Sequence, residues 1–250
     1  MAVEVVATDL GSLPEGGFEE HTPIFRSSEG FLGVEAPDAH SYVDLSFGNK
    51  FAFQVDGVIS LKESERLMIF TEEMGFRDAA PGIQTPPGMR QNTTVHWMVH
   101  PRDADLLYSR IAPFVPNVLE GRDCMHKLSH RFNTYRYKPG QQFRPHLDGD
   151  WPGYYVSPKS QQLEYWKTGR SMLSMLLYLN GQEQGVEGGD TLLLEKGMVV
   201  QRIKPHCGRA LFFRHGIHPM SVLHAGDILG NGAAKYVIRI NVMYQSVAID

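Results

Sequence analysis

The chain has 250 residues, of which 42% are hydrophobic and 21% are charged. This length and composition are typical of a globular protein with a sizeable core, and they suffice for one β-sandwich or barrel domain. The formal net charge of −4 at pH 7 gives no reason to expect nucleic acid or an anionic membrane as a partner.

Signals for export or membrane insertion are not visible in the sequence. The opening residues, MAVEVVATDLGSLPEGG, lack the basic region and the apolar core of a signal peptide. No apolar run approaches the roughly 18 residues that span a bilayer. The two cysteines, Cys124 and Cys207, are most simply interpreted as reduced thiols of an intracellular protein. We therefore expect a soluble, cytoplasmic protein, whose oligomeric state the sequence does not indicate.

The N-terminal third combines an irregular arm with two helices. Residues 1–48 are rich in Gly, Pro, Asp, Glu and Ser, which predicts an irregular arm outside a single domain over 49–250. A first strand is expected within 51–60, followed by a helix over 62–74 with Ser60 as its N-cap. A loop over 81–89 and a second amphipathic helix starting near Asp103 complete this part.

The texture changes from Lys127 onward, where short apolar runs follow one another between Gly, Pro and Asn signals. The runs are HRFNTYRY, SMLSMLLYLN, DTLLLE, VVQRIK, RALFFRH and KYVIRINVMY. Short strands with frequent turns are typical of a sandwich or barrel. The predicted fold is therefore mainly β with flanking helices.

A candidate metal site begins at His146 and Asp148, which lie two residues apart at a predicted strand end. Side chains at i and i+2 of a strand point the same way, so both can reach one metal ion. Two histidines and one carboxylate with open positions form the facial triad of non-haem Fe(II) oxygenases. We choose His224 as the third ligand, because it closes an apolar run that precedes a turn and a strand with a basic residue. His218 is the main alternative.

Five motifs in order resemble the Fe(II)/2-oxoglutarate-dependent dioxygenases, specifically their prolyl-4-hydroxylase-like branch. They are YKPG before HLD, YLN followed by GGDT, GRALFF, LHAG, and KYVIRINVMY. The likeness covers 128–244 within a core of about 128–246. It implies a double-stranded β-helix core of the jelly-roll, cupin-like kind, which agrees with the pattern of short strands.

The resemblance also implies residues that hold the co-substrate. The distal carboxylate of 2-oxoglutarate needs a buried cation, and both Lys235 and Arg239 are candidates on one face of the last core strand. Tyr137 and Tyr135 are candidate hydrogen-bond partners of 2-oxoglutarate. Ser174 stands where relatives often carry a threonine near the co-substrate.

The implied reaction is hydroxylation of an unactivated C–H bond, coupled to decarboxylation of 2-oxoglutarate to succinate and CO2. Fe(II), 2-oxoglutarate and O2 are the implied cofactors, with ascorbate as a candidate reductant. Because halogenating relatives replace the carboxylate ligand with a small residue, Asp148 disfavours halogenation; desaturation and ring closure stay open. A cupin-like metal enzyme that does not use 2-oxoglutarate and a non-catalytic binding module are the alternatives.

The substrate is a small molecule or a peptidyl residue. The aromatic segment 149–170 follows the metal ligands and is expected to be a substrate lid, with Trp151 and Tyr154 as candidate contacts. The alternative is a surface loop folded on its own aromatic side chains. Arg90 and Asn92, which precede the core, form a second candidate pair.

Overall fold

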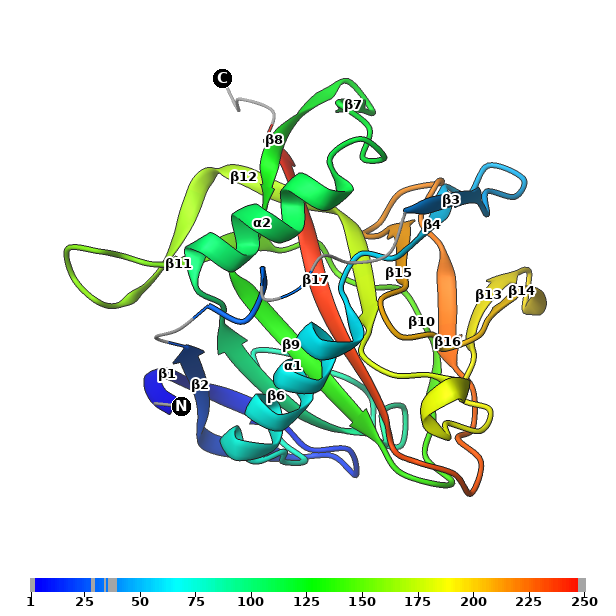
Figure 1. Cartoon of the computed structure of the whole chain (residues 1–250), viewed down its shortest axis with the longest axis horizontal. Coiled ribbons are helices and arrows are strands. Elements are labelled where there is room, and N and C mark those ends of the chain that lie inside the picture. Colours follow the sequence, from blue (N-terminus) through cyan, green and yellow to red (C-terminus); the bar gives the residue numbers. More distant parts are fainter. Residues whose placement is uncertain (1–2, 28–29, 34, 36–39, 247–250) are drawn as a thin grey trace.

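The computed structural model describes residues 3–27, 30–33, 35 and 40–246. Figure 1 shows a mainly β molecule, with a large and a small sheet and two helices in the described residues. This confirms the fold class predicted from the sequence. No helix of the described residues is long and apolar enough to cross a membrane.

The large sheet has thirteen strands. Ten form the continuous order β3 (Ser41–Asp44), β4 (Ala52–Asp56), β15 (Ala210–Arg214), β12 (Leu163–Tyr178), β17 (Lys235–Gln245), β9 (Arg131–Tyr137), β6 (Thr93–Met98), β2 (Phe18–Ser27), β1 (Val3–Ser12) and β5 (Ala80–Pro81). Off this path lie β11 (Pro152–Val156) on β12, β8 (Arg122–Leu128) on β17, and β7 (Val118–Leu119) on β8.

The small sheet has the order β10 (Phe143–His146), β16 (Leu223–Gly226), β13 (Thr191–Glu195) and β14 (Met198–Ile203), and a short 3₁₀ turn, η1 (Gln182–Gln184), precedes β13. Buried side chains of both sheets pack together between them, among them Tyr135, Leu176, Leu193 and Phe213. The two sheets therefore enclose an interior into which both can project functional side chains.

The helices α1 (Leu61–Met74) and α2 (Pro101–Ile111) cover the opposite face of the large sheet. Apolar residues of the helices pack with the outward residues of β6, β9 and β17, among them Phe70, Leu107, Trp97 and Ile240. The predicted start of the first helix is confirmed, because Ser60 accepts a hydrogen bond from the Glu63 amide and Glu63 bonds back to the Ser60 amide.

The prediction that residues 1–48 form an irregular arm is wrong. β1 and β2 form an antiparallel hairpin, and β2 pairs in parallel with β6 at the edge of the core sheet. Most residues of β1 are exposed or half-buried, so the strand does not need an apolar pattern. Backbone hydrogen bonds rather than buried side chains hold it in place, and composition does not reveal such pairing.

The segment 149–170 is also more regular than the expected loop. β11 and the first half of β12 form a hairpin, in which Tyr155 stacks on Trp166 at 5.7 Å. Lys127 lies over the ring of Trp166 from outside the hairpin. The hairpin is thus folded on its own aromatic side chains, as the alternative interpretation had it.

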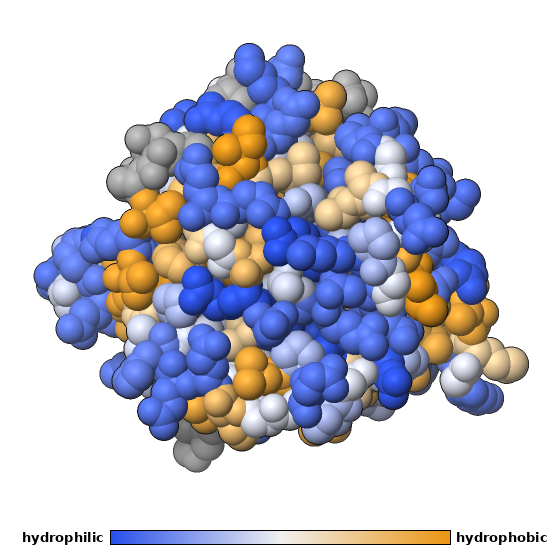
Figure 2. All heavy atoms as spheres, turned by 90° about the horizontal axis from the view of Figure 1, so that it is seen from below, coloured by the Kyte–Doolittle hydropathy of each residue, from blue (hydrophilic) through white to orange (hydrophobic). Residues whose placement is uncertain are grey.

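The molecular face in Figure 2 is mainly hydrophilic, with apolar side chains in separate groups. The polar character of this face agrees with an apolar core enclosed by the sheets and helices rather than spread over the surface.

Candidate metal centre

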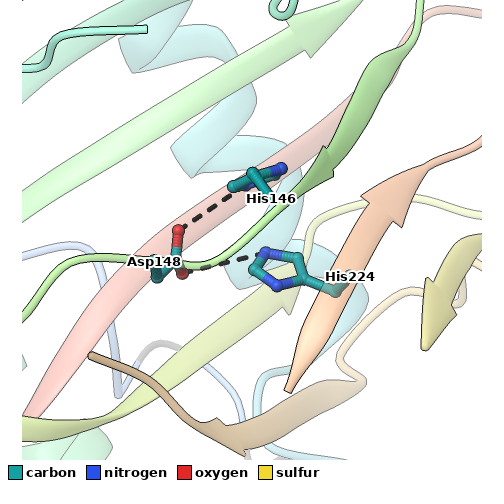
Figure 3. A group of neighbouring side chains, drawn as sticks. All are labelled: His146, Asp148 and His224. Atoms are coloured by element: carbon teal, nitrogen blue, oxygen red, sulfur yellow. Dashed lines mark ion pairs between the residues drawn. The ribbon is translucent and has the colours of Figure 1, made fainter. Parts of the chain in front are cut away.

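Three ligand-type side chains converge between the sheets. His146 ends β10, Asp148 follows it, and His224 lies in β16 directly opposite His146 in the strand register. His146 Nε2 lies 3.6 Å from Asp148 Oδ1, and His224 Nε2 lies 3.9 Å from Asp148 Oδ2 (Figure 3). One ligand atom from each residue lies within 4.8 Å of the other two. Such spacing fits the coordination of a single ion by all three.

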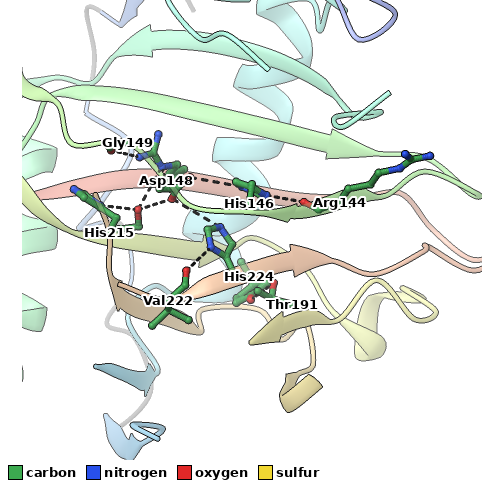
Figure 4. Close-up of polar contacts among 11 residues, drawn as sticks. Arg144, His146, Asp148, Gly149, Thr191, His215, Val222 and His224 are labelled. Carbon is green, nitrogen blue, oxygen red and sulfur yellow. Dashed lines mark hydrogen bonds and ion pairs between the residues drawn. The ribbon is translucent and has the colours of Figure 1, made fainter. Parts of the chain in front are cut away.

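Backbone carbonyls fix the orientation of both imidazoles. The Nδ1 atoms of His146 and His224 lie 2.8 Å and 3.2 Å from the carbonyl oxygens of Arg144 and Val222 (Figure 4). A carbonyl can only accept, so Nδ1 carries the proton and Nε2 keeps its lone pair for a metal. Burial lowers the pKa of His224 to about 3 and lowers that of His146, so both rings are neutral at pH 7.

The carboxylate of Asp148 is buried and held by a hydroxyl and a guanidinium. Ser174 Oγ donates to its Oδ2 at 2.6 Å, and Arg239 Nε donates to the same atom at 2.8 Å. Burial alone would raise the pKa of Asp148, but Arg239, the two histidines and the Ser174 hydroxyl outweigh it and hold that pKa well below its ordinary value. Asp148 is therefore ionised, as a metal ligand must be.

His215 and His218 do not join this group. His215 is fully buried and bridges Ser171 at 2.9 Å and Ser174 at 3.0 Å, which places it behind Asp148 (Figure 4). His218 lies instead 3.1 Å from Glu120. The structure thus brings His224, and not His218, to the pair His146 and Asp148.

A narrow chamber of about 30 Å³ continues from the metal group toward Lys235. Lys235 is almost fully buried, donates to the Gly189 carbonyl at 2.6 Å and lies 4.5 Å from the ring centre of Tyr137. Burial lowers the pKa of Lys235 to about 8, with Asp190 and Asp227 opposing the shift. Burial also raises the pKa of Tyr137, which leaves a neutral phenol in the chamber wall.

The two candidate cations of β17 have different surroundings. Both line the chamber, but Arg239 is engaged by Asp148 and by the Gly149 carbonyl at 3.2 Å. Within the described residues, Lys235 has no carboxylate at ion-pair distance. The described residues thus give Lys235 no anionic partner at ion-pair distance, whereas Arg239 is paired with Asp148.

A wider cavity of about 400 Å³ also borders His146 and Asp148. Its lining includes Tyr135, His146, Asp148, Trp151 and Arg239. This size is within the usual range of small-molecule sites. Among the aromatic residues of 149–170, Trp151 reaches this cavity, whereas Tyr154 lines a neighbouring recess.

Arg90 and Asn92, the second candidate pair for substrate contact, line neither the chamber nor the wide cavity. Arg90 is fully buried and donates to the backbone carbonyls of Ser12, Asp78 and Asn92. Because its guanidinium already binds three backbone carbonyls, Arg90 has a structural role.

Arg131 and Asn241 were not among the candidates named from the sequence. Both line the recess beside the wide cavity, together with Asn133. Strand alternation could have indicated them, because Arg131 shares a strand face with Tyr135 and Asn241 shares one with Arg239.

Two neutral histidines and one ionised carboxylate that border two cavities are the ligand set of a mononuclear non-haem iron site. Residues 132–243 match the profile of the 2OG-Fe(II) oxygenase superfamily. This stretch, which contains His146, Asp148 and His224, is similar to the enzymes of this superfamily, and Fe(II) and 2-oxoglutarate are the cofactors that the family and the three ligands imply. No match was found among curated proteins.

Two solved structures share the fold, which is the double-stranded β-helix expected from the sequence. The viral collagen prolyl hydroxylase of Paramecium bursaria Chlorella virus-1, solved with 2OG, is 17% identical, with a TM-score of 0.50 over 79% of this chain and 97% of that one. A prolyl-4-hydroxylase of Pseudomonas putida is 18% identical, with a TM-score of 0.51 over 76% and 91%. At these identities the likeness concerns the fold.

Proposed function

We propose that the chain is an Fe(II)- and 2-oxoglutarate-dependent dioxygenase that hydroxylates an unactivated C–H bond of a small molecule or peptidyl residue. The observation that supports this most is the buried Lys235, which lines the same chamber as the three metal-ligand candidates and has no carboxylate at ion-pair distance in the described residues. A metal enzyme with no keto-acid co-substrate has no need of that cation.

The residues fit both groups. His146, Asp148 and His224 would hold Fe(II), since imidazole nitrogen and carboxylate oxygen suit this ion. Lys235 would hold the distal carboxylate of 2-oxoglutarate, with the Tyr137 hydroxyl nearby in the chamber wall. When bound, iron and 2-oxoglutarate together activate O2 and release succinate and CO2. Ascorbate is proposed only as the reductant that keeps the iron ferrous.

The protein's own part is to hold these groups and to exclude water. Ser174 and Arg239 fix the Asp148 carboxylate, and His215 in turn holds Ser174. Ser174, predicted to contact the co-substrate, thus acts through Asp148. The presence of Asp148 favours hydroxylation over halogenation.

The decisive test is spectroscopic and needs no substrate. Fe(II) and 2-oxoglutarate are added to the protein without oxygen, and the visible metal-to-ligand charge-transfer band is recorded. We expect the band in the wild type and its loss in Asp148→Ala. Asp150→Ala is the matched control, because Asp150 is an exposed acid paired with Arg170. Bound iron without a band would overturn the use of 2-oxoglutarate.

A further inference from the structure

A chain of buried hydrogen bonds leads from the wall of the wide cavity to the Asp148 carboxylate. The Trp151 amide lies 2.8 Å from Ser171 Oγ, and this hydroxyl lies 2.9 Å from His215 Nε2. The other ring nitrogen, Nδ1, lies 3.0 Å from Ser174 Oγ, which in turn lies 2.6 Å from Asp148 Oδ2 (Figure 4). Ser171, Ser174 and His215 are each at most 1% exposed, so bulk solvent does not reach the middle of the chain.

The two ends of this chain fix the direction of every hydrogen bond in it. An ionised carboxylate can only accept, so the single hydroxyl proton of Ser174 points at Asp148. Ser174 must then accept from His215, whose Nδ1 therefore carries the ring proton. At the other end an amide can only donate, so Ser171 accepts from Trp151 and turns its own proton to His215 Nε2. Only one tautomer of His215 satisfies both serines.

The tautomer of His215 therefore determines where the Ser174 proton points. Burial lowers the pKa of His215 to about 3, so the ring is neutral and has a single N–H group. With the proton on Nε2, Nδ1 would become an acceptor and would compete with Asp148 for the Ser174 hydroxyl. Asp148 Oδ2 would then keep only the donor of Arg239. Ser171, which does not touch Asp148, thus selects the tautomer on which the metal ligand depends.

The orientation of Asp148 matters because its two oxygens have different surroundings. Ser174 and Arg239 both donate to Oδ2, whereas Oδ1 accepts no hydrogen bond within the described residues and stays free for a metal ion. The main chain is held as well, because the Gly216 amide donates to the Asp148 carbonyl at 2.8 Å. His215 and its neighbour Gly216 thus hold the side chain and the backbone of the same ligand.

We propose that His215 is a positioning residue of the iron site, which keeps Asp148 Oδ1 free for the metal and joins Asp148 to the wall of the substrate cavity. The wall residue is Trp151, which borders the wide cavity and whose backbone is tied to Ser171 by hydrogen bonds in both directions. A substrate that moves Trp151 acts on the metal ligand through this chain. The inference rests on the proposed function, because it assigns His215 to the same metal centre.

A role for His215 in core packing alone leads to different expectations. If the ring only filled the interior, an apolar side chain of similar size would replace it without an effect on the metal. The directed chain requires one donor and one acceptor at this position. Glutamine supplies both and leucine supplies neither, so this pair of variants separates the two roles.

The first test measures the binding of Fe(II) without oxygen, followed by the charge-transfer band with 2-oxoglutarate. His215→Leu should bind Fe(II) about 10- to 100-fold more weakly than the wild type, as the loss of a contact that orients a metal ligand predicts. His215→Gln should recover most of this affinity and the wild-type position of the band. Equal Fe(II) affinity in the wild type and His215→Leu, or in the two variants, would overturn the proposal.

Ser171→Ala serves if the histidine variants do not fold, because it removes a single hydroxyl. It leaves His215 free to take either tautomer, so Fe(II) binding should weaken about tenfold although Ser171 does not contact Asp148. The matched control is Thr134→Val, which removes a buried hydroxyl that accepts from Trp97 Nε1 at 3.0 Å on the helix-covered face of the large sheet. The control should bind Fe(II) as the wild type does. Wild-type affinity in Ser171→Ala would overturn the selection of the tautomer.

A second measurement observes the tautomer directly and needs no co-substrate. Zn(II), which is diamagnetic and binds the same ligand types, replaces Fe(II) in protein with isotope-labelled histidine. Long-range proton–nitrogen NMR spectra then show which ring nitrogen carries the proton, and the signals of His215 are those lost in His215→Gln. We expect the proton of His215 on Nδ1. A proton on Nε2 would contradict the proposed direction of the chain.

The two proposals fail in different ways. Absence of the charge-transfer band in the wild type would contradict the use of 2-oxoglutarate, whichever tautomer His215 has. A normal band and wild-type Fe(II) affinity in His215→Leu would leave the dioxygenase intact and would make His215 a residue of the core alone.

Discussion

Lys235 carries a charge whose presence depends on pH near the physiological range. Burial lowers its pKa to about 8, so the free protein loses this proton as the pH rises through that value. Because only the charged form pairs with a carboxylate, we expect the dissociation constant of 2-oxoglutarate to rise about tenfold per pH unit above pH 8. Anaerobic titration of the charge-transfer band from pH 7 to 9.5 measures this.

The matched variant is Lys235→Arg, whose guanidinium stays charged throughout this range. Its dissociation constant for 2-oxoglutarate should therefore stay constant between pH 7 and 9.5. A wild-type affinity that does not change between pH 7 and 9.5 would contradict the role of Lys235.

The same burial means that the charged Lys235 destabilises the folded state. Its folded pKa lies below the value of 10.5 for a free lysine, so the charged form is disfavoured in the folded state. This loss of unfolding free energy has its full value below pH 8 and disappears as the pH rises toward 10.5. Lys235→Met should therefore stabilise the ligand-free protein by up to about 3 kcal/mol at pH 7, while abolishing 2-oxoglutarate binding.

Urea unfolding at pH 7 compares this variant with Arg239→Met. Arg239→Met should lower the unfolding free energy by about 3–5 kcal/mol, because it leaves the Asp148 carboxylate buried without its cation. Similar changes in both variants would mean that the two cations have equivalent roles, contrary to their different contacts.

The three metal ligands could be predicted from the sequence, but the choice between Lys235 and Arg239 could not. The pair His146 and Asp148 is close in sequence, so strand periodicity alone placed both side chains together. The choice of His224 over His218 came from its apolar run and agrees with the strand pairing, whereas distinguishing Lys235 from Arg239 depends on contacts made only in the folded sheets. The register of β16 on β10 and the contact of Arg239 with Asp148 are properties of the folded sheet.

At the scale of elements, one buried carboxylate joins the two helices to each other. Glu63 completes the cap of α1 and also binds Arg110 of α2 at 2.8 Å, with its side chain fully buried. Burial tends to raise the pKa of Glu63, but Arg110 and the Ser60 and Gly33 amides lower it below its ordinary value. Glu63→Gln should therefore cost about 3 kcal/mol of unfolding free energy.

The control is an exposed ion pair, that of Arg202 with Asp227, for which Arg202→Gln should change stability by less than about 0.5 kcal/mol. Ser60→Ala isolates the cap, and its expected cost is about 1 kcal/mol. Chemical denaturation of the three variants separates the contributions. A cost for Glu63→Gln no larger than that of Ser60→Ala would mean that the pair with Arg110 adds nothing.

Helix and strand positions could be predicted where an element buries one face. The capping box predicted the start of α1, and apolar runs predicted β9, the second half of β12, β13, β14, β15 and β17. The hairpin of β1 and β2 could not be found in this way, because its residues are mostly polar and its bonds are made by the backbone. The aromatic residues of the β11–β12 hairpin suggested a lid because composition does not show that Tyr155 and Trp166 stack on each other.

At the scale of the whole molecule, the site is assembled from distant parts of the chain. His146 and His224 come from the small sheet, whereas Ser174, Lys235 and Arg239 come from β12 and β17 of the large one. A ligand that contacts both sheets therefore binds only when they are packed together, and the unfolded chain offers it nothing comparable. Ligand binding should stabilise the folded state as a whole.

The size of this stabilisation follows from mass action. With free ligand at about 100 times its dissociation constant, the folded state gains about 2.7 kcal/mol, which raises the melting temperature by roughly 5–10 °C for a chain of this size. We expect this rise on anaerobic addition of Fe(II) and 2-oxoglutarate together. Asp148→Ala has its own effect on stability, so the quantity to compare is the ligand-induced shift of each protein, which should vanish in the variant. An equal shift in Asp148→Ala would place the bound metal elsewhere, and the two sheets would then be held together without help from the site between them.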